Sequence, residues 1–225
     1  MIAADEIGKM WPIFLPAADA PLAQRGLPPK GALHPLRIQN RTYTADEYPD
    51  IEERKRAFTE DAIFLNDQGY NVYTPLNPII SSFAGDRTNK LAVADADIAC
   101  RHLLLIDLDR AGVADNSATD GEIRQAFEVA DRITSWLLDA HGIEPVRVMS
   151  GNGIHLYVPL RLPNDKNSEA LCRQLLRALA LRYNTDTIKV DTSVFNAGRI
   201  TKVPGTIARK GTETDERPFR MARVL

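Results

Sequence analysis

Two carboxylates stand two positions apart, directly after an apolar run in the middle of the chain. The run, Leu103 to Ile106, is typical of a buried strand, and Asp107 and Asp109 follow it. Side chains two apart on a strand point to the same face, so both carboxylates are expected on one side of a sheet. Carboxylates this close repel each other unless a cation neutralises them, and the hard ions Mg²⁺ and Mn²⁺ prefer such oxygen ligands. The pair alone is a weak signal, because the same spacing occurs in ordinary strand-end turns and in sugar-nucleotide transferases.

A third carboxylate strengthens the prediction of a metal site. Asp191 follows a short segment, residues 188–190, that is predicted to be the last strand of a β-α-β-β-α-β unit. In that arrangement the first and fourth strands can lie side by side, which would bring Asp191 close to Asp107 and Asp109. Three carboxylates from two neighbouring strands could hold one or two metal ions, the usual apparatus for in-line displacement at phosphorus.

A glycine-rich turn separates two short predicted strands in the second half of the chain. Its sequence is Ser150-Gly151-Asn152-Gly153-Ile154-His155. Two glycines allow backbone N–H groups to turn toward an anion, and the serine hydroxyl adds another donor. His155 begins the outgoing strand, where its ring could donate to a phosphate oxygen. The alternative is a plain β-hairpin with an exposed histidine.

A basic segment follows the third carboxylate. It places four cations within 12 positions: Arg199, Lys202, Arg209 and Lys210. Residues 199–225 together carry a formal charge of +4, which leaves −6 on the rest of a chain whose net charge is −2. Cations spaced by turn residues suit a triphosphate or a nucleic-acid backbone, although a solvated tail of mixed charge is the alternative.

Hydrophobic periodicity predicts the elements that position these residues. We expect helices and strands at residues 50–68 (helix), 70–76 (strand), 102–106 (strand), 122–138 (helix), 145–149 (strand), 154–160 (strand), 168–183 (helix) and 188–190 (strand). The apolar stripe of the last helix is expected to include Leu171, Leu175 and Leu179. The fold class is therefore α+β, with an RRM-like or ferredoxin-like β-α-β-β-α-β sheet and an N-terminal α/β flanking region. We divide the chain into a flanking region, 1–95, and a catalytic unit, 96–225, which together form one domain.

Residues 1–50 contain seven of the 14 prolines, so this stretch is expected to be mostly irregular. Cys100 and Cys172 are the only cysteines and stand far apart, which predicts no zinc site and no disulfide, as in a reducing compartment. The chain begins without the pattern of a secretion signal, and it has no apolar run near the roughly 18–20 residues that span a membrane. A cytoplasmic protein with no membrane partner is expected.

Taken in order, the motifs resemble those of the archaeo-eukaryotic primase (AEP) superfamily, and most of all the primase-polymerases of bacterial mobile elements and phages. The resemblance covers about residues 70–225. Besides the three carboxylates, the glycine turn and the basic segment, four further segments carry it: Asn77-Pro78, Asp95-Ala96-Asp97-Ile98, Ser117-Ala118-Thr119-Asp120 and Glu216-Arg217-Pro218.

The resemblance implies a role for each candidate residue. Two divalent ions, Mg²⁺ or Mn²⁺, would be held by the catalytic residues Asp107, Asp109 and Asp191. The nucleotide would be bound by Ser150, Gly151, Gly153, His155, Arg199 and Lys202, and the template or a phosphate by Arg209 and Lys210. The implied reaction is template-directed nucleotidyl transfer, in which NTPs or dNTPs make or extend a primer on single-stranded or primed DNA. Many relatives carry a zinc-binding or helical accessory domain, or a helicase, so such a partner is expected here.

Two other functions use the same residues. One is a binding module that holds single-stranded nucleic acid or a nucleotide without chemistry, although such modules stack bases on paired aromatic residues. Tyr157 is the only aromatic residue between positions 143 and 160, which makes a poor platform. The other is an untemplated oligonucleotide synthase, which needs the same acids and cations.

Overall fold

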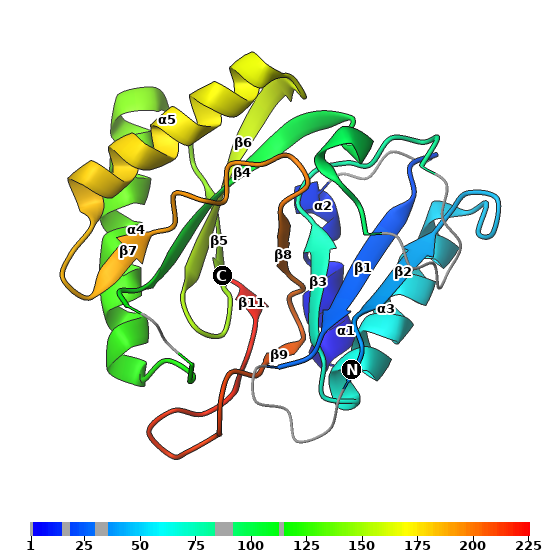
Figure 1. Ribbon diagram of the computed structural model, residues 1–225, viewed down its shortest axis with the longest axis horizontal. Coiled ribbons are helices and arrows are strands. Elements are labelled where there is room, and N and C mark those ends of the chain that lie inside the picture. Colours follow the sequence, from blue (N-terminus) through cyan, green and yellow to red (C-terminus); the bar gives the residue numbers. More distant parts are fainter. Residues whose placement is uncertain (1, 15–18, 30–35, 84–91, 113–114) are drawn as a thin grey trace.

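The computed structural model describes residues 2–14, 19–29, 36–83, 92–112 and 115–225, and two main β-sheets dominate it (Figure 1). The first sheet has the strand order β2-β1-β3-β8 and the second has the order β11-β5-β6-β4-β7. A two-stranded ribbon of β9 (Ile207–Ala208) and β10 (Arg220–Met221) lies below them in Figure 1. All pairings between neighbouring strands are antiparallel.

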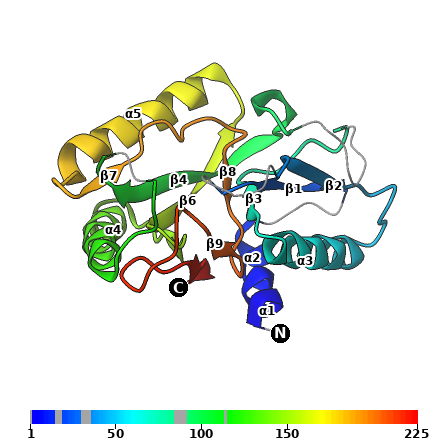
Figure 2. The same ribbon diagram turned by 60° about the horizontal axis from the view of Figure 1, so that its bottom comes forward.

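The first sheet is built largely from the N-terminal part of the chain. Its strands are β1 (Leu22–Leu27), β2 (Gln39–Tyr43), β3 (Asn71–Pro75) and β8 (Ile200–Lys202). The helices beside it are α1 (Ile2–Gly8), α2 (Trp11–Phe14) and α3 (Ile51–Asp67), and α3 packs on β1, β2 and β3 (Figure 2). The expected helix at 50–68 and strand at 70–76 are confirmed. The side chain of Asp50 accepts a hydrogen bond from the N–H of Glu52 at the start of α3, and Gly69 ends it with a φ of 91°.

The expectation that residues 1–50 are mostly irregular is wrong. The described residues of this stretch contain α1, α2, β1 and β2. Neither β1 nor β2 has the β-branched alternation of an obvious strand, since their sequences are LAQRGL and QNRTY. Their ladder with each other and with β3 stabilises them, and such tertiary context overrides local propensity.

The second sheet confirms the β-α-β-β-α-β prediction. Its elements are β4 (Cys100–Arg110), α4 (Asp120–His141), β5 (Val146–Met149), β6 (Ile154–Pro163), α5 (Lys166–Tyr183) and β7 (Ile188–Val190), with β11 (Arg223–Val224) added at the edge. β4 pairs with β7, as expected for the first and fourth strands. The helix α4 packs on β4, β6 and β7, while α5 packs on β7 and on α4. Both helices lie in the left half of Figure 1, whereas the first sheet lies in the right half.

Two details of the second sheet differ from expectation. β4 does not end at Ile106 but continues to Arg110, so the Asp107–Asp109 pair lies within the strand. The buried face of α5 consists of Ser168, Cys172, Leu176, Leu179 and Tyr183. Leu171 is 53% exposed and does not belong to the buried stripe, because the stripe that meets the sheet is rotated by about one residue.

The two sheets share one hydrophobic core. Tyr43 and Phe58 of the N-terminal half belong to the same buried cluster as Leu105 and Tyr157 of the second sheet. Phe14 of α2 contacts Tyr157 directly, with ring centroids 5.8 Å apart. No helix in the described ranges is both long enough and apolar enough to cross a membrane.

Candidate active site

A cleft of about 440 Å³ lies between the two sheets, with walls from β3, β8, β4 and β6. It gathers eight of the eleven residues that the sequence singled out: Asp107, Asp109, Ser150, His155, Arg199, Lys202, Arg209 and Lys210. Asp191, Gly151 and Gly153 do not line it, although each lies next to residues that do.

Asp107 and Asp109 form the acidic wall of the cleft, and Asp191 lies beside Asp107. Asp107 and Asp109 project to the same side of β4, and the backbone N–H of Asp191 donates to the carbonyl of Asp107 at 2.9 Å. Burial, followed by repulsion from Asp109 and Asp191, raises the pKa of Asp107 from 3.8 to about 7. The positive charges of Arg199 and Lys210 act in the opposite direction but do not cancel this effect.

This donor set suits a hard divalent cation in its chemistry, because three mutually repelling carboxylates gain from added positive charge. Among the described residues, however, no three His, Cys, Asp or Glu side chains converge to hold a metal ion as they stand. Asp191 accepts instead from the N–H of Ser193 at 2.8 Å, and Asp109 accepts from the N–H of Arg110 at 2.9 Å. These bonds use only the Oδ1 atom of each carboxylate.

The glycine turn packs closely against Leu108 of β4 and Ala208 of β9. A Cβ atom at Gly153 would lie 2.2 Å from the carbonyl oxygen of Leu108, and one at Gly151 would lie 2.4 Å from Cβ of Ala208. Gly151 also has a φ of 102°, which favours glycine. The Ser150 hydroxyl donates to the carbonyl of Gly153 at 3.1 Å and accepts from its N–H at 3.2 Å. These contacts give the glycines and Ser150 a structural role in holding the turn against β4 and β9.

His155 lies opposite Asp107 in the β4–β6 ladder and is buried, with 7% of its surface exposed. Its Nε2 atom is 3.4 Å from Oδ1 of Asp107, and its Nδ1 atom is 3.1 Å from Oγ1 of Thr201. Burial lowers the pKa of His155 to about 4, so its ring is neutral near pH 7. The alternative of a plain hairpin with an exposed histidine is therefore wrong.

Four cations, Arg199, Lys202, Arg209 and Lys210, form the basic wall of the cleft, and Lys210 reaches to within 3.9 Å of Asp109. Lys202 is buried, donates to the carbonyl of Ile207 at 3.0 Å, and lies 5.5 Å from the ring centre of Tyr73. Burial, and then repulsion from Arg209, holds the pKa of Lys202 well below its ordinary value. Among the described residues, one buried guanidinium nitrogen of Arg199 (Nε) and one of Arg209 (Nη1) have no hydrogen-bond partner.

No protein-family model matches the sequence, and no curated protein matches it significantly. The fold nevertheless matches solved structures. The AEP domain of the cyanophage S-2L primase-polymerase aligns with a TM-score of 0.54 at 17% identity, over 98% of this chain and 88% of that one. The polymerase domain of Mycobacterium tuberculosis ligase D, solved in complex with DNA, aligns with a TM-score of 0.53 at 17% identity, over 97% and 79%. The chain has the AEP fold.

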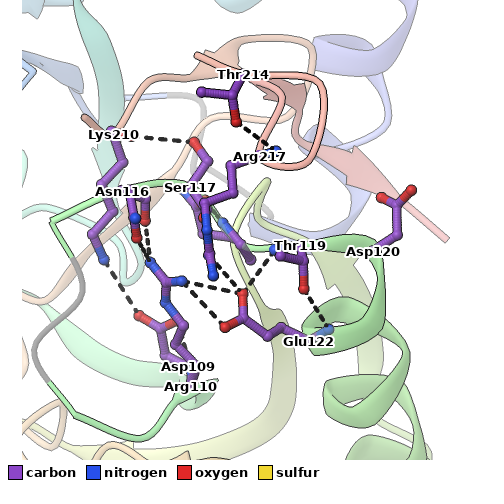
Figure 3. Close-up of polar contacts among 12 residues, drawn as sticks. Asp109, Arg110, Asn116, Ser117, Thr119, Asp120, Glu122, Lys210, Thr214 and Arg217 are labelled. Atoms are coloured by element: carbon purple, nitrogen blue, oxygen red, sulfur yellow. Dashed lines mark hydrogen bonds and ion pairs between the residues drawn. The ribbon is translucent and has the colours of Figure 1, made fainter. Parts of the chain in front are cut away.

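Within this AEP fold, a network of charged residues positions the segments around Asp109 (Figure 3). Glu122 of α4 accepts from Arg110 at 3.1 Å and from Arg217 at 3.0 Å. Partial burial works against ionisation of Glu122, but the Thr119 N–H and the two guanidinium groups hold its pKa below the ordinary value. This network ties the end of β4 to the start of α4 and to the C-terminal loop. Lys210 lies beside it, with its ammonium 3.9 Å from Asp109.

Two other motifs of the AEP resemblance fix the backbone near the cleft. The buried Asn77 accepts from the N–H groups of His102 and Leu103 at 2.8 and 2.9 Å, and it donates to the carbonyl of Ala197 at 3.1 Å. Asp95 accepts from the N–H of Gly198 at 2.7 Å. Together they hold the start of β4 and the chain that leads into Arg199.

The sequence did not single out Asn71, Tyr73 or Thr201, which also line the cleft. Asn71 clamps the backbone of Arg209 with two hydrogen bonds of 2.8 Å. Tyr73 stands directly opposite Lys202 in the β3–β8 ladder. The alternation of the predicted strand 70–76 could have placed Tyr73 and Asn71 on one face, but nothing local indicates that β8 reaches this sheet.

Proposed function

We propose that this chain is a primase-polymerase. It transfers a nucleoside monophosphate from an NTP or dNTP to a 3′-hydroxyl, directed by a DNA template. The observation that carries the proposal is one cleft with an acidic wall and a basic wall, in a chain with the AEP fold. A nucleoside triphosphate and its metal ions need both walls at once.

The basic wall binds the triphosphate in this proposal. Arg199 and Arg209 bring two guanidinium groups to the cleft, and Lys202 and Lys210 add two amines. The pKa of Lys202 in the cleft is low. The negative charge of a bound phosphate would raise this pKa, so the amine would gain a proton when the phosphate binds. His155, as a neutral ring, adds a hydrogen-bond donor without adding charge.

In this proposal Asp107 and Asp109 of the acidic wall, with Asp191 beside them, would hold two divalent ions, Mg²⁺ or Mn²⁺. Bound there, the ions would activate the attacking hydroxyl and neutralise the leaving pyrophosphate. The protein's own contribution is to hold three carboxylates where they repel one another, so that a cation is favoured. Protons compete with metal for Asp107, whose pKa is about 7, so activity should rise with pH through this value.

The flanking region, 1–95, and the catalytic unit, 96–225, act as one domain in this proposal, because β8 of the second pairs with β3 of the first. The template is single-stranded or primed DNA, since the ligase D domain of similar fold is in complex with DNA. A helicase or an accessory priming domain is the expected partner for starting primers.

The test is extension of a labelled primer on a DNA template with dNTPs or NTPs, in Mg²⁺ or Mn²⁺. We expect metal-dependent extension that is lost in Asp107→Asn and Asp191→Asn and retained in Asp139→Asn, which changes an exposed carboxylate on α4. Near-normal extension by Asp107→Asn would refute the site. Extension without a template strand would favour an oligonucleotide synthase, and nucleotide binding that needs no metal would favour a binding module.

A further inference from the structure

A chain of polar contacts crosses between the two sheets at the cleft. The hydroxyl of Tyr157 lies 2.8 Å from Oγ1 of Thr201, which lies 3.1 Å from Nδ1 of His155. On the other side of the ring, Nε2 is 3.4 Å from Oδ1 of Asp107. Tyr157 and His155 come from β6 and Asp107 from β4, whereas Thr201 comes from β8 of the first sheet. Because Tyr157 and Thr201 are 0% and 1% exposed, water does not compete for these contacts.

The donor and acceptor in each of these hydrogen bonds follow from the Tyr157 hydroxyl, which stands at one end of the chain of contacts. Burial raises the pKa of Tyr157 far above neutrality, so its hydroxyl keeps its proton. Among the described residues this hydroxyl has one hydrogen-bond partner, Thr201, so its proton points to Oγ1. Thr201 must then donate its own proton to Nδ1 of His155, which leaves the ring proton on Nε2, facing Asp107. The reverse direction would leave the Tyr157 proton without an acceptor among the described residues.

We propose that Thr201 is a positioning residue, whose hydroxyl holds His155 in the tautomer that carries its proton on Nε2. This rests on the proposed function, in which that N–H turns from Asp107 to a phosphate oxygen when the nucleotide binds. The strand β8 thereby contributes to the site through a residue that need not touch the substrate. Loss of the hydroxyl would leave Nδ1 without its donor, and the ring could then carry its proton on either nitrogen.

The direct test is the ¹⁵N NMR spectrum of the ring in the full chain at pH 7.5, with His155 assigned from His155→Gln. Long-range ¹H–¹⁵N correlations distinguish the two tautomers and the doubly protonated ring. We expect the Nε2–H form in the wild type, a mixture in Thr201→Val, and the Nε2–H form again in Thr201→Ser. Valine keeps the shape of threonine without its hydroxyl, and serine restores the hydroxyl.

The second readout is the affinity for dATP with Mn²⁺, measured by calorimetry. Thr201→Val should bind about fivefold more weakly and Thr201→Ser about as tightly as the wild type, since one neutral hydrogen bond is affected. In primer extension, the KM for the nucleotide should rise in Thr201→Val while kcat stays nearly unchanged.

The proposal is overturned if the wild-type ring carries its proton on Nδ1 or on both nitrogens, if Thr201→Val leaves the spectrum unchanged, or if serine fails to restore it. Should Thr201→Val not fold, Tyr157→Phe serves instead, because it removes the group that orients the Thr201 hydroxyl. We expect a mixture of tautomers there, and an unchanged spectrum would overturn the proposal. Absence of nucleotide binding in the wild type would refute the proposed function, whereas the spectrum alone decides the tautomer.

Discussion

Replacing Asp107 by asparagine should stabilise the folded protein while it abolishes nucleotidyl transfer. In the folded chain the Asp107 carboxylate is buried and repelled by Asp109 and Asp191, and its pKa is about 7 rather than 3.8. The unfolded chain therefore ionises this group more easily than the folded chain does. The contribution of Asp107 to the free energy of unfolding is therefore fully present below about pH 4. It is lost as the pH rises to about 7, because the folded chain must then hold a buried charge. Asparagine has no such loss, because it does not ionise.

The size of the effect follows from the two pKa values. At about 1.4 kcal/mol per pH unit, the difference between 3.8 and about 7 sets an upper limit of about 4 kcal/mol at pH 8. The side chain is 26% exposed, and solvent screening reduces the expected gain to about 2 kcal/mol. Near pH 4 the variant and the wild type should unfold with nearly equal free energies.

The assay is urea unfolding at pH 4.5 and pH 8, followed by circular dichroism, with Asp139→Asn as the matched control on an exposed carboxylate. Added Mn²⁺ should raise the midpoint of the wild type at pH 8 and leave Asp107→Asn nearly unchanged, since a bound ion stabilises only the state that holds it. A variant that is less stable than the wild type at pH 8, or whose gain is the same at both pH values, would refute this reasoning.

Two further predictions test the turn and the basic segment. Gly153→Ala should lower the free energy of unfolding by about 3 kcal/mol, because the new Cβ would meet the Leu108 carbonyl at 2.2 Å. The control is Gly121→Ala, whose Cβ has only ordinary contacts and which should change this free energy little. Equal urea midpoints for the two variants would contradict the packing argument. Binding of single-stranded DNA should weaken as salt rises, with a log–log slope of about −3 if about four cations of residues 199–225 contact phosphates. An affinity measured by fluorescence anisotropy that is flat between low and high salt would exclude that role for the segment.

Much of the second sheet could be predicted from the sequence because its signals are local. The helix α4 begins at the capping residue Thr119, whose side chain pairs with Glu122, and it ends at Gly142 in the left-handed conformation. Apolar runs mark β4 and β6, and the spacing of Asp107 and Asp109 places both on one face of β4. Each of these signals depends on residues close together in the chain, so it can be read without the fold.

The parts that escaped prediction depend on contacts between distant residues. β1 and β2 have weak strand signals, and β8 has only three residues, Ile200–Lys202, followed closely by Pro204. These segments become strands because β3 provides a partner ladder, about 130 positions before β8 in the chain. The same dependence hid the role of Thr201, which faces His155 only because β8 joins the first sheet.

The path of the chain between β7 and β9 explains why site and fold are coupled. Within residues 191–210 the chain leaves the second sheet at Asp191, passes Arg199, pairs with the first sheet through β8, and reaches Arg209 and Lys210 beside the turn. One segment thus supplies the third carboxylate, the basic wall and the hydroxyl that orients His155. A change in how the two sheets pack would move all three together, because they lie on one short segment that contacts both sheets. The geometry of the cleft is therefore set by this crossing as much as by either sheet.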